Sequence, residues 1–262
     1  MEEPHVLYQK DGHVAAITLN RPEARNAFSP EMLELWRAYL VEARADDEVR
    51  VVILPGAGDT FCSGGDIREM AEGKLTSWTM KAFLWEGVHR IVLAMEDLDK
   101  PMIAAINGAA MGAGLDMALM CDLRLCSDRA KLAESYILLG LVPGDGGAFF
   151  LPRVVGLAKA MELLLTGDAI GAEEALDMGL VNRVVPDRSL MDEAVELARK
   201  IASRPPQAVR MMKRAVYQGF ASSLRAHLDY ISSQVSLLSE TSDHREAAKA
   251  FLEKREPLFT GR

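Results

Sequence analysis

The sequence predicts an α/β protein with an all-helical C-terminal end. Apolar runs typical of buried strands alternate with segments of helical periodicity up to about residue 195. Two of these runs are each followed by a glycine-rich turn and the start of a helix. After Pro186 no strand pattern remains, and helices are expected at 190–203, 207–218, 224–239 and 243–255.

The elements before Pro186 follow from local signals. Strands at 6–10 and 14–19 flank Asp11-Gly12, a strong two-residue hairpin signal. Ser29-Pro30 supplies an N-cap and a first helical position for a helix with one apolar face. The remaining elements in this part are a strand at 49–54, a longer helix at 79–95, a strand at 102–106, a short helix from Leu115, a strand at 123–127, helices at 156–165 and 172–178, and a strand at 181–185.

The two glycine-rich turns carry the strongest functional signal. They occupy residues 61–67 (Phe-Cys-Ser-Gly-Gly-Asp-Ile) and 107–116 (Asn-Gly-Ala-Ala-Met-Gly-Ala-Gly-Leu-Asp). Backbone N–H groups at a strand-to-helix turn are free, and the helix N-terminus adds partial positive charge. Small residues let a ligand approach the backbone closely. Two such turns together can hold a developing oxyanion between two N–H donors, which requires no histidine or metal.

Composition restricts the class of protein. A chain of 262 residues fits one large domain, or a domain with a small appendage. The net charge of −8 argues against a nucleic-acid partner, because phosphate binding relies on a dense basic surface. The apolar window 102–120 is interrupted by polar residues and glycines, so no membrane span is expected. Three cysteines without a CxxC motif and an acidic N-terminus favour the cytoplasm.

In their order and spacing, these stretches resemble the crotonase (enoyl-CoA hydratase/isomerase) superfamily. The resemblance extends from Ile17 to Arg255 and includes residues 20–28, 166–168 and 175–182. It implies a crotonase-like spiral of strand-strand-helix units. No cofactor is implied other than coenzyme A as part of the substrate.

The resemblance also implies a division of the chain. Residues 1–195 would form the α/β core with the acyl-CoA site. Residues 196–262 would form a helical C-terminal region that lies over coenzyme A and assembles a homotrimer or a dimer of trimers.

Carried over by position, the family's two oxyanion donors are the backbone N–H groups of Gly65 and Ala113. They would bind the thioester carbonyl oxygen of an acyl-CoA as it becomes an enolate. Coenzyme A would contact Arg25, the segment from Ser63 to Arg68, and Phe251 and Lys254 from a neighbouring subunit. Within that segment the implied contacts are Ser63, Gly64, Asp66, Ile67 and Arg68. The guanidinium of Arg68 suits a phosphate group.

The acid–base positions depart from the hydratase pattern. Where hydratases of this family carry two glutamates, this chain has Asp116 and Tyr136. Tyrosine, with a reference pKa of about 10, is a poor base at neutral pH but a usable hydrogen-bond donor. Asp145 is a third candidate. Isomerases of the superfamily carry an acidic residue at this position or beside it, and dehalogenases of the superfamily carry a nucleophilic aspartate in this loop. Glu134 is expected to be a solvated neighbour.

Several alternatives remain open. Asp145 could be a turn residue or helix N-cap, and Tyr136 could pack in the core. The first interpretation is an enoyl-CoA hydratase/isomerase with Asp116 as the principal acid–base group. The alternatives are a hydrolase or lyase acting on a cyclic or aromatic acyl-CoA through Asp145, and a non-catalytic CoA-binding homologue. The five histidines lack metal-ligand spacing and are expected at surface or packing positions.

Overall fold

The α/β prediction is confirmed by a computed structural model, which describes residues 3–68 and 76–262. The main sheet has six strands in the order β1-β2-β3-β5-β7-β10. Strands β1 and β2 form the expected antiparallel hairpin, and the other neighbours are parallel. The strands are β1 (Val6–Asp11), β2 (Val14–Leu19), β3 (Val51–Pro55), β5 (Met102–Ile106), β7 (Leu123–Ser127) and β10 (Arg183–Val185).

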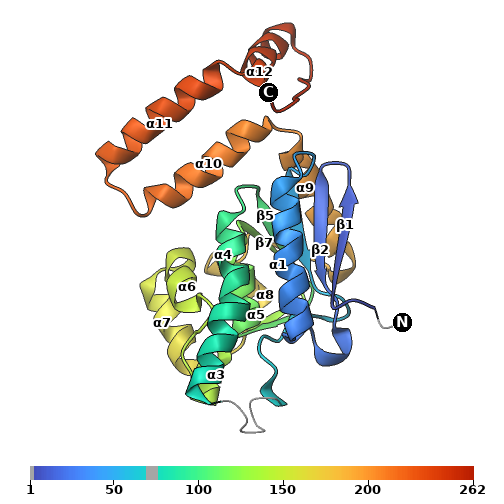
Figure 1. The fold of residues 1–262 in the computed structure, drawn as a ribbon, viewed down its shortest axis with the longest axis vertical. Helices are drawn as coiled ribbons and strands as arrows, with labels where there is room; N and C mark the ends of the chain where they lie inside the picture. Colours follow the sequence, from blue (N-terminus) through green and yellow to red (C-terminus); the bar gives the residue numbers. More distant parts are fainter. Residues whose placement is uncertain (1–2, 69–75) are drawn as a thin grey trace.

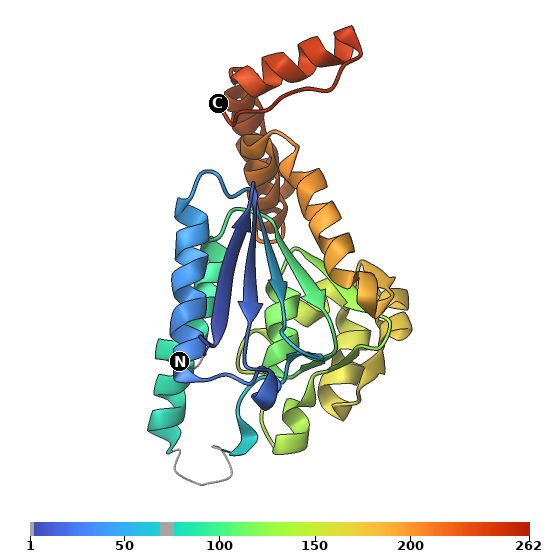
Figure 2. The ribbon, with the colours of Figure 1, turned by 90° about the vertical axis from the view of Figure 1, so that its right-hand side faces the viewer.

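Helices cover both faces of the main sheet (Figure 2). Helices α1 (Pro30–Ala45) and α4 (His89–Asp97) lie on one face, and α9 (Leu190–Ala202) packs on the other. Side chains of β3 alternate between two apolar clusters: Val52 and Leu54 face α1, whereas Val51 and Ile53 face α9. Burial on both faces explains why the parallel strands read as continuous apolar runs.

A second, smaller sheet escapes sequence reasoning because its strands are only two or three residues long. Its order is β4-β6-β8-β9. The strands are β4 (Thr60–Cys62), β6 (Ala109–Met111), β8 (Lys131–Ala133) and β9 (Ile170–Gly171). The first three are parallel, so their carboxyl ends meet at one edge of this sheet. Helix α5 (Ala113–Met120) begins directly after β6.

The long helix expected at 79–95 is helical throughout but not uniform. It consists of α3 (Ser77–Ala82), a π-helical segment (Phe83–Val88) and α4. The N-cap of α3 is Thr76, whose side chain accepts a hydrogen bond from the backbone N–H of Thr79. Three more helices follow α5, namely α6 (Gly147–Val155), α7 (Leu157–Thr166) and α8 (Ala172–Asp177).

The C-terminal helices extend away from the sheets (Figure 1). They are α10 (Pro206–Gly219), α11 (Leu224–Ser239) and α12 (Ser242–Glu253). Ion pairs join α10 to the core: Arg210 and Arg214 contact buried Asp99 at 2.7 and 2.5 Å, and Lys213 contacts Asp122 at 2.8 Å. The division expected near residue 195 falls inside α9, which packs on the main sheet.

In the part of the chain that the structure describes, no helix combines the length and apolar character needed to cross a membrane. The three cysteines, Cys62, Cys121 and Cys126, are buried and form no disulfide.

Candidate active site

Three segments meet at the carboxyl edge of the small sheet. Residues 63–65 follow β4, Gly112 and Ala113 follow β6, and residues 134–136 follow β8. Because β4, β6 and β8 are parallel neighbours, the topology brings both glycine-rich turns and the segment around Tyr136 to one place. The backbone N–H of Gly112 donates to the carbonyl of Ala133 at 2.8 Å, which ties the second turn to the end of β8.

The two glycine-rich turns are in close contact. Gly64 has a φ of +81°, and a Cβ atom placed on it would lie 2.9 Å from the Met111 carbonyl oxygen and 3.1 Å from the Ala113 nitrogen. Both the backbone conformation and the space therefore require glycine at this position. The backbone N–H groups of Gly65 and Ala113 have no hydrogen-bond partner among the described residues. For Ala113 this follows from its place as the first residue of α5.

A buried asparagine that sequence reasoning did not single out supports the first turn. Asn26 is fully buried, and its side-chain nitrogen donates to three backbone carbonyl oxygens, those of Ala57 (3.0 Å), Thr60 (2.7 Å) and Phe61 (3.1 Å). These carbonyl groups lie within β4 and the loop before it, so Asn26 fixes the path of the chain into the turn. Its only signal in the sequence is its place within the stretch 20–28.

Backbone hydrogen bonds join that stretch to the first turn. Ser63 donates its N–H to the carbonyl of Arg25 at 3.1 Å, and Phe28 donates to the carbonyl of Gly64 at 2.8 Å. Asp66 lies 3.7 Å from the Arg21 guanidinium and accepts from the backbone N–H of Arg68 at 3.1 Å. The expected coenzyme-binding residues 25 and 63–68 therefore lie in one contiguous region, with the side chains of Arg25, Ile67 and Arg68 exposed.

The other two expected coenzyme contacts lie elsewhere. Phe251, which is 84% exposed, and Lys254 lie at the end of α12, far from α5 within this chain (Figure 1). The structure of one chain thus does not bring them to the glycine-rich turns, and their contact with coenzyme A from a neighbouring subunit stays a prediction.

Three of the expected catalytic side chains do come together. Asp116 is fully buried and lies three residues after Ala113, on the same side of α5. The Tyr136 hydroxyl lies 2.7 Å from Asp116 Oδ2 and 3.1 Å from Asp145 Oδ2. Asp145, in the loop before α6, is also buried. The hydroxyl is thus positioned between the two carboxyl groups, as a donor to either.

Burial controls the protonation of this group. It raises the pKa of Asp116 to about 6, although the hydrogen bond from Tyr136 opposes the shift. Burial also raises the pKa of Asp145. The pKa of Tyr136 lies well above its ordinary value, because the phenol is buried beside the carboxylates of Asp116 and Asp145. Tyr136 therefore stays protonated, which matches the expected role of a donor and not a base.

The expectation for Glu134 was wrong. This residue is 1% exposed instead of solvated, because its side chain turns inward after β8, towards Asp116 and the start of α6. Burial, with the negative charge of Asp116, raises its pKa to about 10. Neither Glu134 oxygen has a hydrogen-bond partner among the described residues. No local pattern indicates this burial, since an acidic residue after a short strand is usually exposed.

One histidine lies next to the carboxyl group of Asp145. His89, the first residue of α4, has its Nε2 atom 2.8 Å from the Gly144 carbonyl oxygen and 4.0 Å from Asp145 Oδ1. Because a carbonyl oxygen only accepts, Nε2 carries the hydrogen in this contact. His89 therefore links α4 to the loop that carries Asp145.

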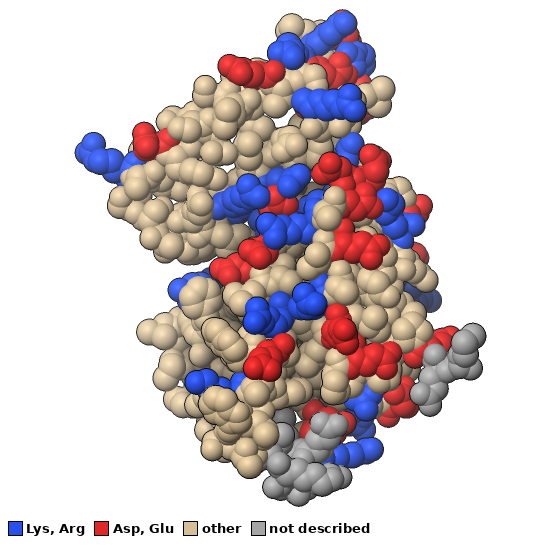
Figure 3. Space-filling view, viewed as in Figure 1, with Lys and Arg blue, Asp and Glu red and all other residues tan. Residues whose placement is uncertain are grey.

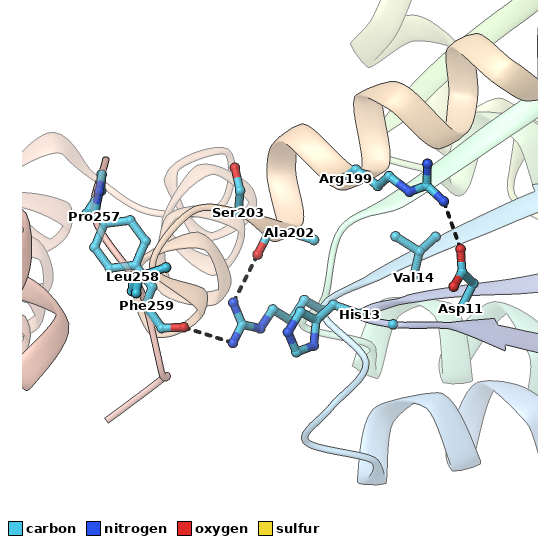
Figure 4. A pocket seen from close by; sticks show the side chains of 11 residues that line it. Asp11, His13, Val14, Arg199, Ala202, Ser203, Pro257, Leu258 and Phe259 are labelled. Carbon is cyan, nitrogen blue, oxygen red and sulfur yellow. Dashed lines mark hydrogen bonds and ion pairs between the residues drawn. The ribbon is translucent and has the colours of Figure 1, made fainter. Parts of the chain in front are cut away.

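A cavity of about 400 Å³ lies away from these groups, beside the first residues of β2 and β3 (Figure 4). The charged side chains that line it have partners within the protein. Arg50 donates to the carbonyls of Ala202 and Phe259, and Arg199 pairs with Asp11 at 2.8 Å. Nothing there resembles the carboxyl cluster. Within the described residues, no set of three His, Cys, Asp or Glu side chains is placed to hold a metal ion.

Comparison with known proteins places the chain in a family. The model of the family "Enoyl-CoA hydratase/isomerase" matches residues 9–262, so the chain belongs to this family and has the crotonase fold. It is an enzyme of the hydratase/isomerase type.

Individual relatives match over nearly their whole length. The short-chain-enoyl-CoA hydratase of Clostridium acetobutylicum is 40% identical, over 97% of both chains. The (E)-benzylidenesuccinyl-CoA hydratase of Thauera aromatica is 40% identical, over 98% of this chain and 99% of the relative. The crystal structure of an enoyl-CoA hydratase from Bacillus anthracis superposes with a TM-score of 0.93 at 37% identity, covering 98% of this chain and all of the other.

Proposed function

We propose that this enzyme binds an acyl-CoA thioester with its carbonyl oxygen between the backbone N–H groups of Gly65 and Ala113. The observation that carries the proposal is the contact between the two glycine-rich turns, which leaves both N–H groups without a partner in the described structure. Donors aimed at an oxygen that gains charge stabilise the enolate more than the ground-state thioester. The partial positive charge at the start of α5 adds to this effect.

Asp116 is the proposed acid–base group. In hydration, its carboxylate accepts a proton from water as the water oxygen bonds to Cβ, and the resulting carboxyl group gives that proton to Cα of the enolate. In a double-bond shift, the same carboxylate removes a proton from one carbon and returns it to another. One carboxylate can serve in both cases only if it relays a single proton, and Asp145 is a second carboxylate in contact with the same Tyr136 hydroxyl. The single hydroxyl hydrogen of Tyr136 is donated to Asp116 or to Asp145, and the place of the hydroxyl between them positions the two carboxyl groups relative to each other.

The raised pKa of Asp116 predicts the pH dependence. The ionised form is the base, so kcat/KM should fall as the pH is lowered through about 6. An unperturbed aspartate would instead lose its charge near pH 4, at about its reference pKa of 3.9. The measurement is kcat/KM against pH with one acyl-CoA substrate. An acidic limb near pH 4, or none, would contradict the role of Asp116.

Asp145 and Tyr136 can be ranked by substitution. We expect Asp145→Asn to lower kcat more than Tyr136→Phe, because Asp145 supplies a second carboxylate, whereas Tyr136 stays protonated and acts through its neighbours. The comparison is made under saturating substrate with both variants shown to be folded. A nearly normal kcat in Asp145→Asn beside a strongly impaired Tyr136→Phe would reverse the ranking.

The acyl group and the reaction subtype call for direct assay. Two similar relatives are named as hydratases of a short-chain enoyl-CoA and of (E)-benzylidenesuccinyl-CoA, so aliphatic and aromatic acyl groups both deserve testing. A panel of unsaturated, cyclic and aromatic acyl-CoA thioesters is incubated with the enzyme and analysed by mass. Gain of water indicates hydration, unchanged mass with a shifted double bond indicates isomerisation, and loss of coenzyme A indicates hydrolysis through Asp145. Binding without conversion across the panel would favour a non-catalytic homologue.

The C-terminal helices are the proposed subunit interface of a cytoplasmic homo-oligomer, a trimer or a dimer of trimers. The face over α10 and α11 is largely uncharged (Figure 3). The exposed apolar side chains of these two helices and the turn between them include Met212, Val216, Phe220, Leu224, Leu228 and Val235. A contiguous apolar surface of this kind marks a protein contact. The same assembly would bring the Phe251 and Lys254 of one subunit towards coenzyme A of another.

Light scattering after size exclusion tests this interface. We expect a mass of at least three chains of 28.7 kDa for the wild type, and a smaller mass for the double variant Phe220→Asp, Leu228→Asp. Val41→Asp, at a half-exposed apolar position on α1, is the matched control and should not change the mass. A monomeric wild type would rule out the oligomer.

A further inference from the structure

Glu134 presents a second buried carboxyl group to Asp116. A Cβ atom placed on Gly147, the first residue of α6, would overlap Asp116 Oδ1 and would lie 3.0 Å from both oxygens of Glu134. All three oxygens thus converge on one point above the start of α6. Glycine at position 147 leaves the space in which the two carboxyl groups face each other.

The hydrogen bonding of this pair is incomplete when both groups are ionised. Asp116 Oδ1 and both Glu134 oxygens are buried and lack a hydrogen-bond partner in the described structure. A carboxylate only accepts hydrogen bonds, so two facing carboxylates repel each other and neither can donate a hydrogen bond to the other. A single proton changes this, because a protonated carboxyl group is a donor to its neighbour.

We propose that Glu134 carries a proton at neutral pH and donates it in a hydrogen bond to Asp116 Oδ1, so that Glu134 is a positioning residue for the catalytic base. The proton belongs on Glu134 because Asp116 already accepts from the Tyr136 hydroxyl at 2.7 Å, which favours its ionised form, whereas Glu134 has no such donor. The raised pKa of Glu134 agrees with this distribution.

The titratable groups around Asp116 are few. Tyr136 and Glu134 lie beside it from the segment after β8, Asp145 in the loop before α6 contacts the same Tyr136 hydroxyl, and His89 of α4 lies next to Asp145. Tyr136 and protonated Glu134 would then donate to opposite oxygens of Asp116. This fixes the plane of the carboxylate and keeps it ionised despite its burial. The effect on catalysis rests on the proposed role of Asp116, but the proton on Glu134 does not.

Infrared difference spectroscopy tests the proton without any substrate. At about pH 8 in D2O, ordinary carboxyl groups are ionised. The spectrum of the wild type minus that of Glu134→Gln should therefore contain the C=O band of a protonated carboxyl group. Asp243→Asn is the matched control, since buried Asp243 accepts from the backbone N–H groups of Thr260 and Gly261 at 2.8 Å. Its removal should not affect that band. Absence of the band in the wild type would overturn the proposal, whether or not the enzyme converts any acyl-CoA.

The pH profile of kcat/KM distinguishes a protonated Glu134, which is a neutral hydrogen-bond donor, from an ionised Glu134, which is a buried negative charge. Glu134→Gln keeps a donor and should leave the acidic limb nearly unchanged. Glu134→Leu removes the donor to an ionised group and should move the limb to higher pH by about 1–2 units. If Glu134 were ionised, both variants would remove a negative charge beside Asp116 and move the limb to lower pH. That direction would overturn the proposal, and thermal melts of both variants verify folding.

Discussion

Asp116→Asn is expected to abolish turnover, with a loss of about 10²–10⁴-fold in kcat, which is the usual contribution of a general acid–base group. The amide can fill the same buried space and accept from Tyr136, but it cannot take a proton from water or from carbon. Affinity for a CoA thioester should stay within about a few-fold, because the proposed donors to the thioester are backbone groups. Steady-state kinetics and a direct binding measurement, such as calorimetry, test the two parts separately.

A matched substitution controls for the change of charge. Asp59 is exposed and lies before β4, outside the carboxyl cluster, so Asp59→Asn should keep the activity of the wild type. If Asp116→Asn retained more than about a tenth of the wild-type kcat, Asp116 would not be the principal acid–base group.

Ala113→Pro is the second substitution with a large expected effect. Ala113 is the first residue of α5, a position where proline fits the helix and where the missing N–H breaks no helical hydrogen bond. The substitution therefore removes one proposed donor to the thioester oxygen at little cost to the fold. Loss of one such donor typically lowers kcat by about 10²–10³-fold. Circular dichroism and a thermal melt verify the fold before kcat is measured.

Ala113→Gly is the control, because it keeps the N–H and only removes a methyl group. We expect it to retain most of the activity, whereas the proline variant loses it. A folded proline variant with normal kcat would show that the N–H of Ala113 does not stabilise the reaction. The enolate mechanism would then lose one of its two donors.

Much of the fold was predictable because its signals are local. The Asp11-Gly12 turn, the Ser29 cap and the apolar runs of β3 and β5 each determine structure within a few residues. The same holds for the glycine-rich turns, whose small residues and position after strands indicated a backbone site. The family comparison confirms the class that these motifs indicated.

The rest depends on contacts that no window of sequence contains. Strands β4, β6 and β8 are three residues each and exist because they pair with one another, so periodicity cannot reveal them. The inward direction of Glu134 follows from that pairing, as does its meeting with Asp116. Likewise, Asn26 acts on carbonyl groups more than thirty residues away. The resemblance to the family pointed to Asp116, Tyr136 and Asp145 by position, but no local pattern pointed to Glu134 and Asn26 behind them.

The number of residues in the π-helical segment Phe83–Val88 determines the direction in which His89 points. A π turn holds more residues than an α turn, so it changes the direction in which every later side chain of the helix points. In an α-helix each residue advances the direction by about 100°. Deleting one residue here, with a return to regular α geometry, would rotate His89 away from Gly144 while leaving its identity intact. Insertions and deletions in this segment would thus affect the Asp145 loop indirectly, because they change the direction in which His89 points from the helix.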